Sequence, residues 1–305
     1  MAKCEWESTT NLIDAAIRIL TEQWPMTIRQ LFYQLVSVLV IENCLRDYRR
    51  VSRAMTIARR DGRVDYDWIV DRSRVTVFSS NWSNVAEIGE VMEMQLKQYR
   101  LDYWQDQPTY CEIICEKDAL TGSLEEVRRE YGLTLEPLRG FDSESKKHEV
   151  ADRFVDARQA GKKVVALYLG DWDPSGKDIE RDLKEQIMDN MRRILELPEN
   201  ARHPLLDIEM RRVGIFKEDI RKFNLPPLKV KNSDPRSAKF VRQHGNRAVE
   251  LDALAPNELR GRLRRAVESL IDHTAWERAR VVEEAQRATC KRYAGVLHKL
   301  SKESA

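Results

Sequence analysis

The acidic residues Glu116, Asp171 and Asp173 are the strongest candidates for chemistry in this chain of 305 residues. Glu116 follows the largely apolar segment "YCEIIC" (110–115), and the two aspartates follow "VVALYLG" (164–170). Ligands of an open parallel sheet bind beyond the carboxyl ends of its strands, so these side chains are expected to meet at one edge. Carboxylates gathered there repel one another unless a cation balances them, and hard oxygen ligands suit Mg²⁺. We therefore expect the three residues to bind Mg²⁺.

Other acids in the chain have a second interpretation as helix caps or surface groups. Asp118 precedes "ALTGSL" and Asp173 precedes "PSGKD", and an aspartate in that position often caps a helix. Glu250 and Asp252 in "ELDAL" are expected in a solvated strand or turn, with a functional role as the alternative. The segment "GDWDPSGKD" is not a phosphate-binding P-loop, because its spacing and its acids differ from that motif.

Basic residues gather in "RDYRRVSRAMTIARRDGR" (46–63) and in "LPPLKVKNSDPR" (225–236). A basic helix is either a solvated face or a surface that contacts phosphates. The second segment is either a DNA-contacting loop or a rigid connector. The candidate DNA-binding residues are Arg49, Arg50, Arg53, Arg59, Arg60, Lys229 and Lys231.

The segment 1–84 is expected to form a winged helix-turn-helix that binds DNA. Apolar residues at helical spacing predict a helix over 10–23, and Thr27 with Gln30 predicts a capping box for a second, buried helix. A third helix is expected from Asp47 to Arg60, and β-type alternation over 63–78 predicts a hairpin. Three helices followed by a hairpin are typical of a winged helix.

After a helical connector over 85–108, strands and helices alternate with short loops. This alternation predicts an α/β fold with a mostly parallel sheet and helices on both faces over 109–255. A helical, charged extension is expected over 256–305.

The composition indicates where the protein is located more clearly than it indicates what the protein does. The formal net charge of +2 does not decide whether nucleic acid is a partner. The start of the chain has no secretory pattern, and the apolar stretch 31–41 is too short to cross a membrane. The five scattered cysteines indicate reduced thiols rather than a zinc site. We expect a cytoplasmic protein without a membrane partner.

The order of these motifs resembles a known family. A glutamate after a first strand and an Asp-x-Asp after a later one resemble the Toprim domain of topoisomerases, primases and some nucleases. More closely, "EKDAL" and "LYLGDWDPSG" are similar to the Toprim half of the topoisomerase VI A subunit and its meiotic double-strand-break relatives, in which a winged helix also comes first. Residues 10–275 further resemble stand-alone phage and mobile-element homologues such as Mini-A.

This resemblance implies a tyrosine nucleophile. The segment "TIRQLFYQL" (27–35) is similar to the family's tyrosine motif, with Tyr33 at the catalytic position and Gln30 in place of an acid. Arg29, one helical turn earlier, would bind the phosphate or lower the pKa of the phenol. A core role for Tyr33 and a surface ion pair for Arg29 are the alternatives.

The function implied is Mg²⁺-dependent DNA cleavage with a covalent link between Tyr33 and DNA. The resemblance also implies a homodimer whose sites combine the tyrosine of one subunit with the metal of the other, associated with the nucleoid. A separate ATPase subunit would be needed for strand passage. The alternatives are a Toprim nuclease that uses water, with Tyr33 in the core, and a DNA-binding regulator without catalysis.

Overall fold

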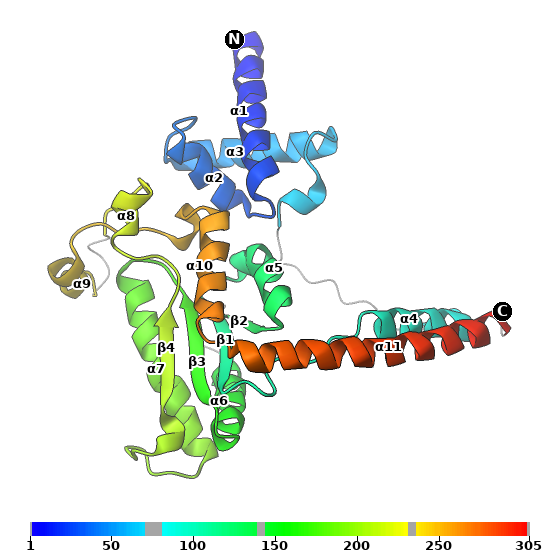
Figure 1. The fold of residues 1–305 in the computed structure, drawn as a ribbon. Helices are drawn as coiled ribbons and strands as arrows, with labels where there is room; N and C mark the ends of the chain where they lie inside the picture. The colour runs from blue at the N-terminus through cyan, green and yellow to red at the C-terminus, as the bar shows by residue number, and fades with distance from the viewer. Residues whose placement is uncertain (1, 71–80, 139–143, 231–235, 304–305) are drawn as a thin grey trace. The chain divides into compact units, whose positions relative to one another are not determined.

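A computed structural model describes residues 2–70, 81–138, 144–230 and 236–303 (Figure 1). The chain divides into two compact units. The first consists of Met1–Arg74 and Tyr110–Ser269, and the second of Val75–Thr109 and Leu270–Ala305. The first unit holds both the predicted winged helix and most of the predicted Toprim domain, so the boundaries expected between these two domains stay a prediction.

A four-stranded parallel sheet forms the centre of the first unit. Its strands are β1 (Thr109–Cys115), β2 (Thr134–Pro137), β3 (Lys163–Leu169) and β4 (Ile208–Arg212). They lie in the order β2-β1-β3-β4, with Glu112 opposite Thr134 and Val164 opposite Ile208. The predicted α/β fold with a parallel sheet and helices on both sides is confirmed.

The helices of the first unit explain why β3 is apolar along almost its whole length. Helices α6 (Glu144–Gln159) and α7 (Pro174–Ile194) cover one face, where Phe154, Tyr168 and Ile187 share a buried core. Helices α5 (Thr121–Tyr131) and α10 (Pro256–Glu268) pack against each other. A strand between two covered faces must bury side chains on both sides, and every residue of β3 after Lys163 is buried.

The amino-terminal part of the first unit contains three helices. They are α1 (Ala2–Gln23), α2 (Ile28–Ser37) and α3 (Leu45–Arg60). The predicted capping box of α2 is confirmed, because the Thr27 hydroxyl accepts from the Gln30 amide while the Gln30 side chain accepts from the Thr27 amide. In the described part of the predicted hairpin, Tyr66–Trp68 form a 3-10 helix, and Ile69 bridges to Met26. Residues 71–78 of that hairpin lie outside the described residues, so the winged helix is not confirmed.

Short elements complete the first unit. They are the helices α8 (Asp219–Lys222) and α9 (Ser237–His244), and 3-10 turns at Asp118–Leu120, Pro204–Leu206 and Leu251–Ala253.

The second unit is built on a pair of antiparallel helices, α4 (Val85–Lys97) and α11 (His273–Glu303). Helix α4 ends at Lys97, so the predicted connector is helical over only part of its length. The helical carboxyl-terminal region is confirmed by α10 and α11. Among the described residues, no helix combines the length and apolar character needed to cross a membrane.

Candidate active site at the carboxylate edge

The three predicted metal ligands lie beyond the ends of two neighbouring strands. Glu116 follows β1, and Asp171 and Asp173 follow β3. The Glu116 amide donates to the Leu169 carbonyl at 2.9 Å, and the Asp171 amide donates to Glu116 Oε2 at 3.0 Å. We call Glu116, Asp171 and Asp173 the carboxylate edge.

The turn from β3 into α7 positions two of these acids. Asp173 caps α7, and its Oδ1 accepts from the Gly176 amide at 2.6 Å, so the interpretation of Asp173 as a cap is confirmed. A Cβ on residue 176 would lie 2.5 Å from the Asp171 carbonyl oxygen, which explains the glycine there. Asp118 does not cap α5, because the residue at the cap position is Leu120 and it makes no side-chain capping bond.

Arg212, at the end of β4, holds the same turn in place, and the sequence analysis did not single it out. Its guanidinium donates to the carbonyls of Gly170, at 3.0 Å, and Asp171, and to Glu180 Oε2 at 2.7 Å. It also lies 5.6 Å from the centre of the Trp172 ring. A buried guanidinium that satisfies the carbonyls of two consecutive residues beyond the end of β3 fixes the path of the chain through Asp171.

Lys117 connects the carboxylate edge to a second group of acids. Its ammonium lies 2.9 Å from Asp171, 2.7 Å from Asp252 and 3.5 Å from Glu250. The segment forms a turn as expected, but the expectation that this turn is solvated is wrong. The Asp252 side chain is 1% exposed, and Asp171 Oδ1 accepts from the neighbouring Leu251 amide at 2.7 Å. The lysine in "EKDAL", next to a strand-end acid, was the only local signal for this cluster.

Burial and neighbouring charges shift the pKa values of several residues in the site. Burial raises the pKa of Asp171 to about 7, with Lys117 opposing the shift and Glu116 adding to it. Burial also raises the pKa of Glu116. For Lys117, burial alone would lower the pKa, but the carboxylates of Asp252, Asp171 and Glu250 outweigh it and raise the pKa. One ammonium therefore does not neutralise this group of acids.

The donor atoms of the carboxylate edge suit a hydrated divalent cation. Glu116 Oε2, Asp171 Oδ1 and Asp173 Oδ1 accept hydrogen bonds, whereas the second oxygen of each carboxylate has no such partner in the described part of the chain. The three acids are not a compact cage. Within the described ranges, the group of three donors found within 4.8 Å of one another is Glu42, Cys44 and Asp47. Mg²⁺ usually keeps several waters and takes one or two carboxylates directly, so this looser arrangement still fits it.

The predicted nucleophile lies beside the same network. The Tyr33 side chain is buried, and the Arg29 guanidinium lies 6.0 Å from the centre of its ring. Arg29 binds Glu250 through both guanidinium arms, at 2.6 and 2.5 Å, and Glu250 in turn contacts Lys117. Burial, followed by the charge of Glu250, raises the pKa of Tyr33 to about 12, although Arg29 lowers it. Tyr33 is therefore protonated at neutral pH in this conformation.

Gln30, which stands where the family that the sequence resembles has an acid, has a structural role. Its Oε1 accepts from the Thr27 amide at 2.9 Å and from the Ser123 hydroxyl at 2.7 Å. The first bond caps α2, and the second joins α2 to α5. The side chain is fully buried, so it is closed to any ligand in this conformation.

The candidate DNA-binding residues differ in their surroundings. Arg49, Arg53 and Arg60 are exposed on α3 and make no ion pair within the described residues, whereas Arg50 is half-buried. Arg59 instead donates to the Ile69 carbonyl at 3.2 Å. Lys229 is exposed, and Lys231 lies outside the described residues. Their role in binding DNA stays a prediction.

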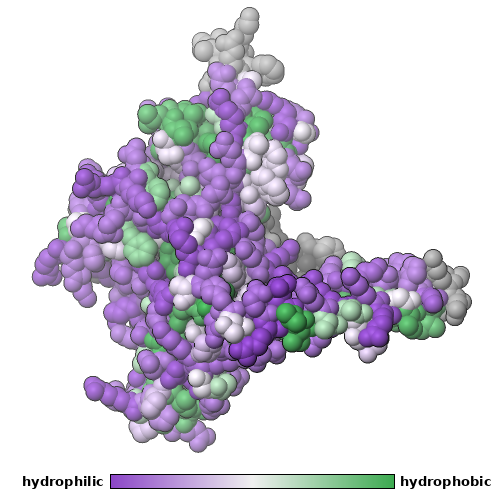
Figure 2. All heavy atoms as spheres, viewed as in Figure 1, coloured by the Kyte–Doolittle hydropathy of each residue, from purple (hydrophilic) through white to green (hydrophobic). Residues whose placement is uncertain are grey.

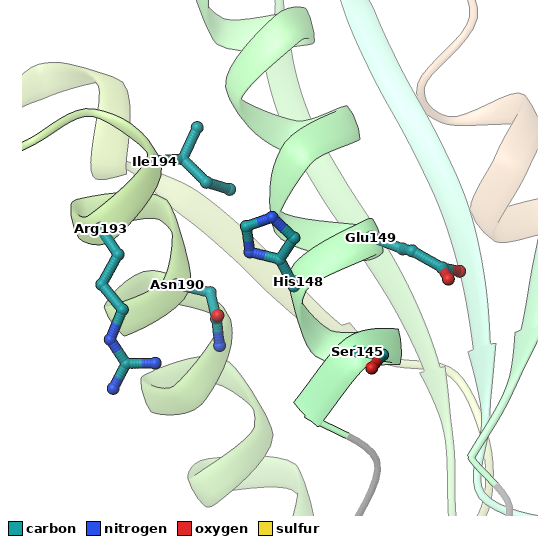
Figure 3. Close-up of a pocket in the computed structure, with 6 residues that line it drawn as sticks. All are labelled: Ser145, His148, Glu149, Asn190, Arg193 and Ile194. Atoms are coloured by element: carbon teal, nitrogen blue, oxygen red, sulfur yellow. The ribbon is translucent and has the colours of Figure 1, made fainter.

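A separate cavity of about 580 Å³ lies between α6 and α7 (Figure 3). In the figure, the His148 ring lies between the two helices, whereas Glu149 points away from α7. None of the predicted site residues lines this cavity. Its lining consists of Ser145, His148, Glu149, Asn190, Arg193 and Ile194.

Comparison of the chain with protein-family models, with curated proteins and with solved structures finds no match.

Proposed function

We propose that this protein cleaves DNA phosphodiester bonds in a reaction that requires Mg²⁺ at the carboxylate edge. The observation that carries the proposal is the set of three carboxylates at adjacent strand ends, each with one oxygen that makes no hydrogen bond in the described part of the chain. Burial is the main cause of the raised pKa values of Glu116 and Asp171, and the charge of Lys117 offsets it only in part.

Each residue of the site has a distinct part in this proposal. Glu116, Asp171 and Asp173 hold the cation, directly or through water. Bound there, Mg²⁺ supplies positive charge to the phosphate oxygens. Lys117 forms an ion pair with Asp171 Oδ1, which leaves Asp171 Oδ2 as the oxygen for the cation. Arg212 fixes the backbone of Gly170 and Asp171, directly after the end of β3.

Water is the nucleophile that these surroundings favour. Tyr33 is 4% exposed, and its pKa of about 12 leaves almost no phenolate at neutral pH. A hydrolytic nuclease therefore needs no rearrangement of α2, whereas attack by Tyr33 requires its phenol to become accessible and to lose a proton.

Attack by Tyr33 is the second candidate, favoured by one specific observation. Arg29, on the same helix as Tyr33, is joined through Glu250 to Lys117 and from there to Asp171. A guanidinium in that place is suited to bind a phosphate once Glu250 releases it. This route leaves the protein covalently attached to a DNA end.

A homodimer is part of the proposal, and the second unit offers a surface for it. Helix α11 exposes Val282, Tyr293, Val296 and Leu300, and hydrophobic atoms reach the surface of the α4–α11 pair in Figure 2. At about 100° per residue, these four side chains lie within about 60° of one another around the helix. Such a stripe is suited to packing against another helix.

A DNA substrate would place the protein with the cytoplasmic nucleoid, and a separate ATPase is needed only if cleavage serves strand passage.

The test combines Mg²⁺ binding with cleavage. Asp171→Asn, Glu116→Gln and Asp173→Asn each remove a charged ligand at nearly constant shape, and asparagine caps a helix as well as aspartate does. We expect cleavage of plasmid DNA to fall at least about 100-fold, since loss of a residue that only supports a ligand already costs about 10- to 100-fold. Calorimetric titration should show weaker Mg²⁺ binding in the same variants.

The matched control is Glu185→Gln, which removes an exposed acid of α7 that pairs with Arg181. It should bind Mg²⁺ and cut DNA like the wild type. Normal cleavage by the Asp171→Asn, Asp173→Asn double variant would overturn the proposal.

A further inference from the structure

A cavity of about 610 Å³ lies between α7 and α9, close to the carboxylate edge. Its lining begins at Pro174, the residue that follows Asp173, and continues along α7 to Lys184. Arg236 and four residues of α9 line the other side, namely Lys239, Phe240, Gln243 and His244, and Met210 of β4 also contributes. We call it the α7–α9 cavity.

The charges of this cavity are strongly biased towards basic residues. Its acids are Asp178 and Glu180, and its bases are Lys177, Arg181, Lys184, Arg236 and Lys239. Each acid is already shared by two cations: Asp178 contacts Arg181 and Arg236, and Glu180 contacts Lys177 and Arg212.

Two of the lysines are left without an acidic partner. Lys184 is half-buried and Lys239 is exposed, and neither makes an ion pair within the described residues. Burial, followed by the charges of Lys177 and Lys217, lowers the pKa of the His244 ring. The cavity is therefore a site of positive potential next to a site of negative potential.

Aromatic rings join the cavity to the carboxylate edge. The rings of Phe240 and His244 pack on Trp172 at centroid distances of 5.9 and 5.0 Å. Trp172 stands between Asp171 and Asp173, and its backbone pairs with Val249. A shift of α9 would therefore also move the turn that contains Asp171 and Asp173.

The spacing of the cations identifies the kind of ligand. Lys177, Arg181 and Lys184 lie on one face of α7 and span about 10 Å along the helix axis. A DNA strand carries one phosphate for about every 3.4 Å of helix axis, so this row spans about three steps between consecutive phosphates rather than a single phosphate. A single phosphate would need its cations to converge on one point.

We propose that the α7–α9 cavity binds consecutive phosphates of a DNA strand beside the position that is cleaved. This inference rests on the proposed function and extends it, because it assigns the path of the substrate on one side of the carboxylate edge. The residues that carry it are different from the arginines of α3.

The experiment measures DNA binding separately from cleavage. The full chain is titrated onto a fluorescent DNA duplex and a fluorescent single strand in EDTA, over a range of salt, and Mg²⁺ is then added to follow cleavage. The Lys184→Gln, Lys239→Gln double variant is compared with Lys162→Gln, Lys163→Gln, which removes two charges at the start of β3, the opposite end from the carboxylate edge. Inorganic phosphate and dAMP serve as competitors.

We expect the cavity variant to bind DNA about five- to tenfold more weakly at about 0.15 M salt, with a salt dependence shallower by one to two ions. The control should match the wild type, and neither competitor should displace DNA at concentrations that saturate a small-molecule site.

Binding by the cavity variant equal to that of the control overturns the inference, whether or not the protein cleaves. Displacement of DNA by dAMP or phosphate at low concentration, or a wild type that binds neither DNA form, overturns it as well. DNA binding that depends on Lys184 and Lys239 without any cleavage in Mg²⁺ supports the cavity and contradicts the proposed function instead.

Discussion

Tyr33 is buried like a core residue, but it lies beside the charged residues of the candidate active site. Its ring packs edge-on against Phe32, and its side chain is buried on α2. Yet Arg29 and Glu250 link its surroundings to Lys117 and the carboxylate edge. The core role and the catalytic role differ in whether the phenol oxygen of Tyr33 takes part in cleavage. The variant that distinguishes them therefore removes only this oxygen.

Tyr33→Phe is expected to keep cleavage within about threefold of the wild type, because a phenol with a pKa of about 12 is not the nucleophile that this conformation favours. Denaturing gels before and after protease digestion measure both cleavage and protein-linked ends. The wild type should leave ends free of protein. Loss of cleavage in Tyr33→Phe, together with protease-sensitive ends in the wild type, would establish the second candidate. Phe32→Leu on the same helix controls for altered packing.

Among the helices, α3 carries most of the exposed arginines on which the predicted DNA binding depends. Arg49, Arg53 and Arg60 share one side of this helix, because at about 100° per residue they lie within about 40° of one another around its axis. Buried Val51, Ala54, Met55 and Ala58 hold the opposite side against the rest of the unit. Arg59 is separated from the exposed row by its bond to the Ile69 carbonyl.

Replacing Arg49, Arg53 and Arg60 by alanine should weaken DNA binding and reduce the slope of log affinity against log salt by two to three units, about 0.9 for each phosphate that is no longer neutralised. Fluorescence anisotropy at several salt concentrations measures this slope, and circular dichroism checks the fold. As a control, Arg280→Ala in α11 removes an exposed arginine that pairs within its own helix. An unchanged slope in the triple variant would leave this side of α3 as a solvated face.

At the scale of the whole molecule, the chain leaves the first unit after residue 74, forms α4 and returns, and its last residues then pair with α4 in the second unit. This pairing uses one side of α11, where Ala279, Glu283 and Ala294 are buried. The stripe of Val282, Tyr293, Val296 and Leu300 lies on a different side of the helix and is exposed.

If the stripe joins two copies, Val282→Glu with Val296→Glu should convert a dimer into a monomer without unfolding the chain, since both side chains are exposed. Sedimentation velocity at about 10 µM measures the change. Val281→Glu is the matched control, because Val281 is also exposed but lies about 100° away from Val282 around the helix. A wild type that sediments as a monomer would contradict the homodimer, and a dimer that survives the double change would place its interface elsewhere.

The local pattern of the chain predicted much of the first unit. The alternation of apolar runs with helical segments indicated the parallel sheet, because a strand covered on both faces must be apolar throughout. Thr27 and Gln30 predicted the start of α2. Gly132 ends α5 in the left-handed conformation that glycine favours. The meeting of Glu116 with Asp171 and Asp173 followed from topology alone, since parallel strands direct their ends to the same edge.

By itself, then, the sequence determined the sheet, the ends of its strands and the acids placed there, because these depend on residues close to one another in the chain. The tertiary structure alone decided which charges balance those acids. Lys117 meets Asp252 across 135 positions, and Arg29 meets Glu250 across 221. Nothing in "ELDAL" signals that contact, since Asp252 is buried only once α2 packs over the turn that contains it. Long-range packing likewise paired α4 with α11, which lie before and after the segment Tyr110–Ser269 in the sequence.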